Sequence, residues 1–308
     1  MADLNTTFFL SLIIIVLGYT LKRLGILSQK GAGKELARLI FYVTLPAVIL
    51  KNLTTADMDL AMTLLPFFAP IITAIIILVS YFIHKGRVSR ENLGLYMMMS
   101  LGFNVGNFGF PLFEGIFGAD GVKYAAMFDI GNAIVIFCVC YIIAVYFSPK
   151  NEHNHVQPKL ILKKVATSPP MVAYIIAIIL AFLNISLPWL ISDVIGVIAQ
   201  ANHFIVYLVL GIYLNFNLDK KHWKGIFKVL ITRYAVGLTL GLLFYFILPI
   251  NELARTVLLI CYILPVGMAM LVYVVQYEYD ENFAGMMSNL NIIISFGLMW
   301  LILFLIKI

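Results

Sequence analysis

The sequence predicts an all-α membrane protein that crosses the bilayer many times. Of its 308 residues, 62% are hydrophobic and only 12% are charged, whereas soluble domains average about 45–50% apolar and about 25% charged residues. The mean hydropathy is +1.00. The net charge of +6 arises from basic residues in short segments between apolar stretches, so it does not predict nucleic-acid binding.

Ten apolar segments are long enough to be membrane spans, because a spanning helix needs about 20 mostly apolar residues. A polar stretch, 148–164, separates them into two sets of five, in 1–147 and 165–308. We expect the spans at 6–23, 35–54, 60–83, 92–112, 120–147, 168–187, 190–215, 225–248, 252–276 and 282–306.

The basic residues predict the orientation, since Lys and Arg are enriched in cytoplasmic loops. With the N-terminus outside, fifteen of them fall in inner loops and four in outer loops. We therefore expect a multi-pass protein of the cell membrane with both termini outside and the linker 148–164 in the cytoplasm. Lys51 and Arg233 lie near predicted span ends, where long basic side chains extend to the interface.

The two halves of the chain show a weak internal repeat. AAMFDIGNAIVIF (125–137) aligns with AGMMSNLNIIISF (284–296), which pairs Asp129 with Ser288 and Asn132 with Asn291. Five spans in each half is an odd number, so the second half enters the membrane from the opposite side. The sequence therefore predicts two inverted five-helix repeats.

The fourth and ninth spans carry helix-breaking residues at corresponding positions. SLGFNVGNFGFPLFEG (100–115) contains four glycines, two asparagines and a proline, and CYILPVGM (261–268) contains Pro265 and Gly267. Broken spans at matched positions of two halves are typical of a transporter's binding site. We expect Asn107, Gly109 and Pro111 to mark the end of one half-helix and the start of the next, although kinks in packed helices are the alternative.

Half-helix N-termini carry free N–H groups and about half a positive charge. Two of them meeting near the midplane would suit a carboxylate. The residues expected to form this substrate site are Asn104, Asn107, Gly109, Pro111, Pro265, Gly267, Ser288 and Asn291.

Titratable residues within the spans are candidates for ion coupling. Asp129 lies near the middle of the fifth span, with Asn132 one turn away, and a carboxylate at that depth costs about 2.5–3.5 kcal/mol. It could carry a coupling proton, ligate Na⁺, or accept hydrogen bonds from the broken backbone. His203 lies mid-span beside Asn202 and could couple protons or serve only in packing.

Two segments carry a family resemblance. NVGNFGFPLFEGIFGADGVKYAAMFDIGN (104–132) and LPAVILKNL (45–53) are similar to the bacterial branch of the auxin efflux carrier family, which includes proteins described as malate or malonate permeases. The resemblance implies a fold related to bile-acid/sodium symporters and sodium/proton antiporters. In that fold, spans 1, 2, 6 and 7 form a scaffold, and spans 3–5 and 8–10 form a mobile transport domain with crossing helices 4 and 9. It also implies homodimers, an elevator-like motion, and a carboxylate held by Asn107 or Asn104.

These observations favour a secondary carrier of a small organic anion, such as a mono- or dicarboxylate. Its transport could be coupled to H⁺ or Na⁺, or could be facilitated diffusion. A sodium/proton-type cation antiporter or channel on the same scaffold is the alternative. The sequence contains no P-loop or H-E-x-x-H pattern, so we do not expect an enzyme, and we expect no cofactor or metal.

Overall fold

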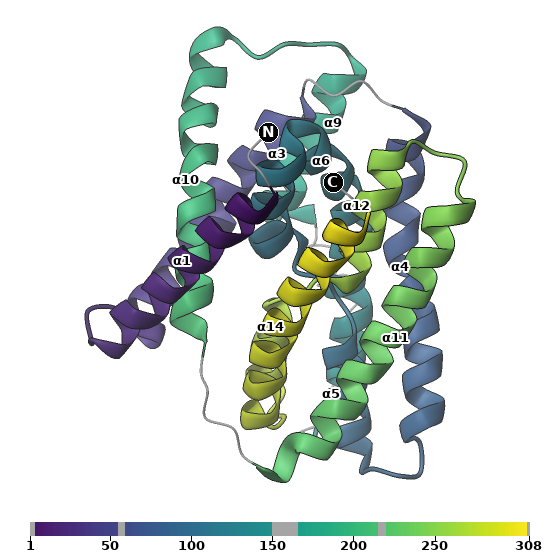
Figure 1. Cartoon of the computed structure of the whole chain (residues 1–308). Helices are drawn as coiled ribbons and strands as arrows, with labels where there is room; N and C mark the ends of the chain where they lie inside the picture. Colours follow the sequence, from purple (N-terminus) through teal and green to yellow (C-terminus); the bar gives the residue numbers. More distant parts are fainter. Residues whose placement is uncertain (1–3, 55–58, 150–165, 215–219, 307–308) are drawn as a thin grey trace.

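The computed structural model describes residues 4–54, 59–149, 166–214 and 220–306, and within these ranges it contains helices and no strand (Figure 1). Most of the predicted linker 148–164 therefore lies outside the described residues. The α-helices are α1 (Leu4–Arg23), α2 (Lys34–Leu39), α3 (Leu45–Leu53), α4 (Leu60–His84), α5 (Arg90–Ser100), α6 (Phe110–Ile134), α7 (Tyr141–Phe147), α9 (Pro169–Phe182), α10 (Trp189–Tyr213), α11 (Trp223–Ile247), α12 (Glu252–Ile263), α13 (Ala269–Gln276) and α14 (Glu281–Leu305). Wider π-helical turns are η1 (Gln29–Gly33), η2 (Ile40–Thr44), η3 (Val105–Gly109) and η4 (Val135–Cys140), and η5 (Lys220–His222) is a 3₁₀ turn.

Seven helical stretches of the described residues are long and apolar enough to cross a membrane. One of them, Val105–Phe147, has 43 residues and would be about 65 Å long as a straight helix, roughly twice the thickness of the hydrocarbon core. Gly118, with φ 66° and ψ −155°, interrupts the helical backbone of this stretch. The chain is thus an all-α polytopic membrane protein, as the sequence predicts.

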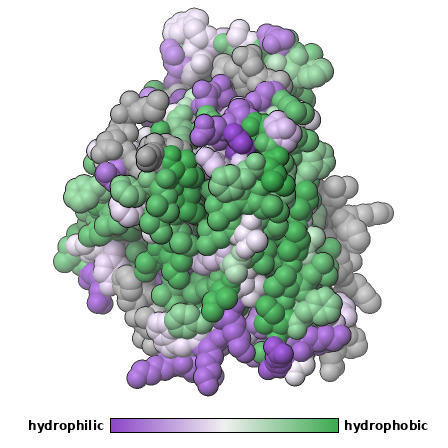
Figure 2. All heavy atoms as spheres, turned by 45° about the vertical axis from the view of Figure 1, so that its right-hand side comes forward, coloured by the Kyte–Doolittle hydropathy of each residue, from purple (hydrophilic) through white to green (hydrophobic). Residues whose placement is uncertain are grey.

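The surface supports the same conclusion. On the face shown in Figure 2, apolar side chains form a broad band across the middle, and hydrophilic residues gather above and below it. The start of α1 and the end of α14 lie near the same end of the molecule (Figure 1), where the Trp300 indole N–H donates to Asn5 Oδ1 at 3.0 Å.

The helices pack in two groups. In the first group, α10 contacts α1 and α3, and α3 contacts α9, while α4 to α7 and α11 to α14 form the second group. α1 and α10 approach so closely that a Cβ atom on Gly211 would lie 2.0 Å from the Ile15 carbonyl oxygen. The second group is similarly tight, because a Cβ atom on Gly131 of α6 would lie 1.8 Å from the Pro66 carbonyl oxygen of α4. Between the groups, α6 contacts α3 and α1.

Two helices of the second group are interrupted. α5 ends at Ser100, and the chain is non-helical over 101–104 before η3 and α6 continue it. α12 ends at Ile263, and the non-helical segment up to Met268 precedes α13. Gly102 adopts a φ of 65°, a left-handed conformation that glycine tolerates without steric cost.

The first interruption lies earlier than the sequence predicted. Gly109 and Phe110 have right-handed helical backbones, so Asn107, Gly109 and Pro111 belong to one continuous helix that begins at Val105. A π-helical turn ends at Gly109, two residues before Pro111, which places the proline where the helical ladder is already irregular. The second interruption contains Pro265 and Gly267, as predicted.

Candidate functional site

The two interruptions contact each other. The backbone N–H of Asn104 donates to the Pro265 carbonyl oxygen at 2.8 Å, which joins the first non-helical segment to the second. Interrupted backbone at membrane depth is tolerated only where protein or a watery cavity surrounds it and its polar groups find partners. The contact between the two segments supplies one such partner.

Two buried asparagines satisfy further groups of the interrupted backbone. The Phe103 N–H donates to Asn132 Oδ1 at 2.9 Å, and Asn132 Nδ2 donates to the Phe103 carbonyl oxygen at 2.8 Å. In the second segment, the Val266 N–H donates to Asn291 Oδ1 at 2.5 Å. The residues that the sequence alignment paired, Asn132 and Asn291, therefore each bind one interruption.

Arg233 of α11 binds both interruptions at once. Its guanidinium donates to the carbonyl oxygens of Ser100 at 2.7 Å, Gly102 at 2.9 Å and Leu264 at 2.8 Å. The side chain is fully buried, so the expectation that it extends to the interface is wrong. The carbonyls around a helix C-terminus carry partial negative charge, which gives this buried cation compensating partners.

A cavity of about 570 Å³ lies beside the crossing. Five of the predicted site residues line it, namely Asn104, Asn107, Asp129, Asn132 and Gly267. Its wall also includes Val105, Gly106, Met268 and Ala269, which form the first turns of the two continuing half-helices. Helix N-termini carry partial positive charge, so both half-helices bring it to this wall; in α13 the N–H groups of Met270 and Leu271 donate to the carbonyl oxygens of Gly267 and Met268.

The two asparagines of the first half-helix differ in their contacts. Asn104 makes no side-chain capping bond to η3, and its backbone N–H forms the contact at the crossing. Asn107 donates only a long hydrogen bond, 3.7 Å, to Met268 Sδ, and its Oδ1 is buried without a hydrogen-bond partner. Both side chains retain hydrogen-bonding capacity for a ligand.

The other predicted substrate residues do not line the cavity among the described side chains. Gly109 and Pro111 lie further along the helix, and Pro265 contributes its carbonyl oxygen to the crossing. Asn291 is fully buried against Val266 and Tyr234, and Ser288 is buried within α14. Of these two, Asn291 binds the second interruption through Val266.

Asp129 lines the cavity, and both of its carboxylate oxygens accept hydrogen bonds. Asn132 Nδ2 donates to Oδ1 at 2.8 Å, and the Tyr174 hydroxyl of α9 donates to Oδ2 at 2.7 Å. One role considered for Asp129 was to accept hydrogen bonds from the broken backbone. Asn132 accepts that bond instead, from the Phe103 N–H, and in turn donates to Asp129. In the described part of the chain, no three His, Cys, Asp or Glu side chains are grouped so that they could hold a metal ion.

Comparison with known proteins identifies the chain. Residues 6–306 match the family described as "Membrane transport protein". The chain belongs to this family, the auxin efflux carriers. It is 26% identical over 298 residues, 94% of this chain and 93% of the relative, to a protein of Methanocaldococcus jannaschii named as an uncharacterized transporter. It is 24% identical over 209 residues, 67% of this chain and 66% of the relative, to an uncharacterized transporter of Methanothermobacter thermautotrophicus.

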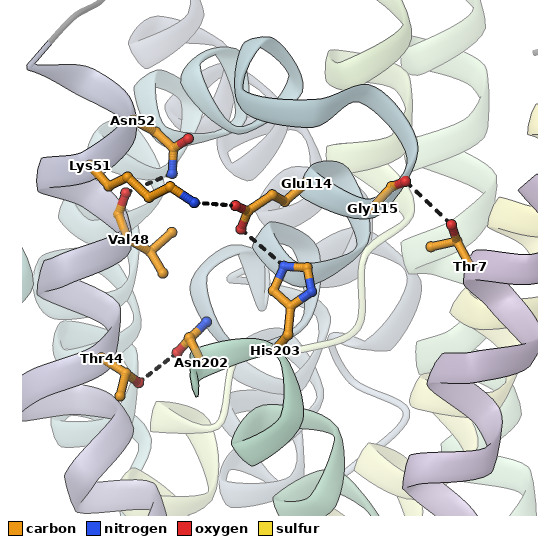
Figure 3. A network of polar contacts seen from close by, with 9 residues as sticks. All are labelled: Thr7, Thr44, Val48, Lys51, Asn52, Glu114, Gly115, Asn202 and His203. Atoms are coloured by element: carbon orange, nitrogen blue, oxygen red, sulfur yellow. Dashed lines mark hydrogen bonds and ion pairs between the residues drawn. The ribbon is translucent and has the colours of Figure 1, made fainter. Parts of the chain in front are cut away.

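In this auxin efflux carrier family member, three ionisable side chains meet away from the cavity (Figure 3). Glu114 of α6 accepts from Lys51 Nζ of α3 at 2.8 Å through Oε1 and contacts His203 Nε2 of α10 at 3.0 Å through Oε2. We call Lys51, Glu114 and His203 the ion triad. Lys51, which the sequence predicts to extend to the interface, has a partly exposed side chain whose ammonium group is paired with the Glu114 carboxylate.

Sequence reasoning missed three residues of this carrier. The predicted fourth span ends at residue 112 and so leaves out Glu114, whereas helical backbone continues to Gly118. The position of Arg233 near the middle of α11 was a usable signal, because a charge at that depth indicates function by default. Nothing in the sequence indicated that Tyr174 reaches Asp129, since 45 residues separate them.

Proposed function

We propose that this protein is a secondary active transporter that carries a small organic anion, a mono- or dicarboxylate, by an elevator-type motion. The observation that carries the proposal is the contact between two interrupted helices, through Asn104 and Pro265, at the wall of a cavity. Interrupted helices that meet in this way form the substrate sites of many secondary transporters.

The charge distribution at the crossing favours an anion. The first turns of η3 and α13 lie at the cavity wall and bring partial positive charge to it. Asn104 and Asn107 also line the cavity, and Asn107 Nδ2, engaged only at 3.7 Å by Met268 Sδ, could donate to an anion instead. The opposite, negatively polarised ends of α5 and α12 are compensated by Arg233. Lys34 and Arg38 also line the cavity and would attract an anion towards it.

A cation/proton antiporter or channel remains the second candidate, and Asp129 is the observation that favours it. The carboxylate lines the same cavity. Its oxygens are already engaged by Tyr174 and Asn132, which favours a role in coupling H⁺ or Na⁺ to anion movement over a role as the main cargo site.

The proposed mechanism assigns the two helix groups to different roles. α1, α3, α9 and α10 would form the scaffold, and the group containing both interrupted helices would form the transport domain. We propose ten spans in two inverted repeats. The division of Val105–Phe147 at Gly118 supports ten spans, and the matching contacts of Asn132 and Asn291 support the repeat.

The proposed placement in the cell follows from the sequence. Both termini would lie outside and residues 148–164 in the cytoplasm, in a homodimer embedded in the cell membrane. An even number of spans agrees with the proximity of the start of α1 and the end of α14. The cavity would then open inwards, because its wall includes Ser168 at the start of α9, Tyr213 at the end of α10 and Gln276 at the end of α13.

Uptake of radiolabelled malate, malonate and a monocarboxylate into proteoliposomes, with and without Na⁺ and a pH gradient, tests the proposal. We expect saturable flux that Asn104→Ala and Asn107→Ala abolish, while Asn5→Ala, at an exposed site on α1, leaves it unchanged. Normal transport by both cavity variants at every substrate concentration would show that the crossing is not the binding site. Charge movement without any organic anion would favour the antiporter or channel.

A further inference from the structure

The ion triad joins the two helix groups. Its carboxylate, Glu114, lies on α6 in the second group, whereas Lys51 and His203 lie on α3 and α10 in the first (Figure 3). Next to it, the Thr7 hydroxyl of α1 donates to the Gly115 carbonyl oxygen at 3.3 Å. Three helices of the first group thus hold one turn of α6.

The ion triad lies on the far side of the crossing from the cavity. Glu114 follows Asn104 by ten residues, or about 15 Å along a helix, and no member of the triad lines the cavity. The contact therefore closes the space between the two groups on the side where the cavity does not open.

The titratable groups that contact Glu114 are Lys51 from α3 and His203 from α10. Its side chain is 20% exposed, against 33% for Lys51 and 35% for His203. Because a carboxylate only accepts hydrogen bonds, His203 must carry its proton on Nε2 to satisfy this contact. One carboxylate thus serves both basic partners.

A sliding motion of α6 against α3 and α10 would separate the carboxylate from both partners. An ionised carboxylate without partners at membrane depth is costly, and breaking one side of a partly buried pair leaves an uncompensated charge. A neutral carboxylic acid avoids that cost. Lys51 is partly exposed, so its ammonium group can be hydrated after separation.

We propose that Glu114 is a proton-binding site whose protonation stabilises the open state of the contact between the two helix groups. When the contact opens, the Glu114 carboxylate loses its hydrogen bonds from Lys51 and His203 and takes up one proton from the aqueous phase opposite the cavity, and the neutral side chain moves with α6. The proton is released when Glu114 returns to its basic partners. This inference rests on the proposed elevator motion and adds a coupling residue to it.

The test that needs no substrate is hydrogen–deuterium exchange of the full-length protein in nanodiscs between pH 5 and pH 8, corrected for intrinsic exchange rates. In the wild type, we expect amides of residues 112–117 to exchange about tenfold faster at the acidic end, a change typical of losing one partly buried ion pair. Glu114→Gln should exchange fast at every pH. Asp120→Asn, which removes an exposed pair with Lys123 within α6, should behave like the wild type.

Variants of the basic partners identify which group titrates. Lys51→Met and His203→Gln should each keep the response and move its midpoint to higher pH, because a carboxylate without its donors takes up a proton more readily. A response that persists in Glu114→Gln, or that disappears in His203→Gln alone, would overturn the assignment to Glu114. A wild-type protein without any pH response would do the same.

Carboxylate flux measured on the same variants separates this inference from the proposed function. Flux of malate or malonate that loses its dependence on external pH in Glu114→Gln supports both. Flux whose pH dependence is unchanged in that variant overturns the proton site and leaves the anion carrier standing. Absence of carboxylate flux in every protein, with the exchange response intact, would contradict the anion carrier and support the proton site.

Discussion

Arg233 shows how a single buried charge can hold an interrupted fold together. Its guanidinium supplies donors to three carbonyl oxygens that two helix ends leave without intrahelical partners. It also lies over the ring of Phe103, 4.6 Å from the centroid, a distance at which cation and ring attract each other. The residue therefore stabilises the crossing by means that neither interrupted helix provides for itself.

Replacing Arg233 should destabilise the protein strongly. Arg233→Met leaves three buried carbonyls without a donor, each costing about 1–3 kcal/mol, so we expect a melting temperature lower by about 6 °C or more. The melting temperature of Arg233→Lys should lie between those of the wild type and Arg233→Met, because an ammonium group lacks the planar guanidinium geometry that reaches several acceptors. Thermal unfolding of purified protein in detergent measures both, with exposed Arg87→Met as control. Wild-type stability of Arg233→Met would contradict this role.

Asp129 should affect transport more than folding. Asparagine at this position retains an acceptor for the Tyr174 hydroxyl but cannot bind or release a proton. We expect Asp129→Asn to melt within about 2 °C of the wild type, a small effect on this scale, and to alter the dependence of uptake on pH or Na⁺. Tyr174→Phe, which keeps the carboxylate, is the matched variant. An unchanged profile across pH and Na⁺ would reduce Asp129 to a structural acceptor.

At the scale of the helices, the position of an interruption depends on partners that are distant in sequence. Proline and glycine content predicted that the fourth span would break, and Pro265 and Gly267 located the second break correctly. The first break lies at 101–104, because Asn132 and Arg233 satisfy the backbone there. Local residue preferences could not predict that choice, since these partners are 29 to 131 residues away.

The contact between α1 and α10 depends on a glycine without room for a side chain. A Cβ atom at Gly211 would meet backbone atoms of α1, which cannot move as a side chain can. We therefore expect Gly211→Ala to cost about 1–3 kcal/mol, as overpacking does, and to lower the melting temperature. Gly196→Ala in the same helix has open space around it and should be neutral. Equal melting temperatures for the two variants would show that α1 and α10 separate without cost.

For the whole molecule, the sequence pattern predicts the features that follow from the order of residues along the chain. It does not predict contacts between residues that are distant in the sequence. Hydropathy alone predicted an all-α polytopic protein, and the repeat alignment selected Asn132 and Asn291, both of which bind interrupted backbone. The ion triad joins residues 63 and 89 positions apart. Glu114, the acidic member of the triad, is not part of a recognisable sequence motif. Its contact with Lys51 and His203 is therefore evident only in the folded structure.

A disulfide between the two helix groups tests the elevator motion directly. A Cβ atom on Gly115 would lie 3.7 Å from the Thr7 Cβ, within the range of about 3.5–4.5 Å that disulfides require. Cysteine at position 7 also lacks the threonine methyl group that crowds Gly115. The double variant Thr7→Cys/Gly115→Cys should therefore cross-link α1 to α6 under mild oxidation.

We expect the oxidised double variant to bind substrate but to lose uptake at least about tenfold, because an elevator cannot move while its two parts are covalently joined. Reduction with dithiothreitol should restore uptake. Each single cysteine variant, treated with the same oxidant, controls for the native cysteines, of which Cys140 and Cys261 are buried. Undiminished uptake by a fully cross-linked protein would mean that α6 stays fixed against α1 throughout transport, and the substrate would then have to cross by local gating around a stationary site.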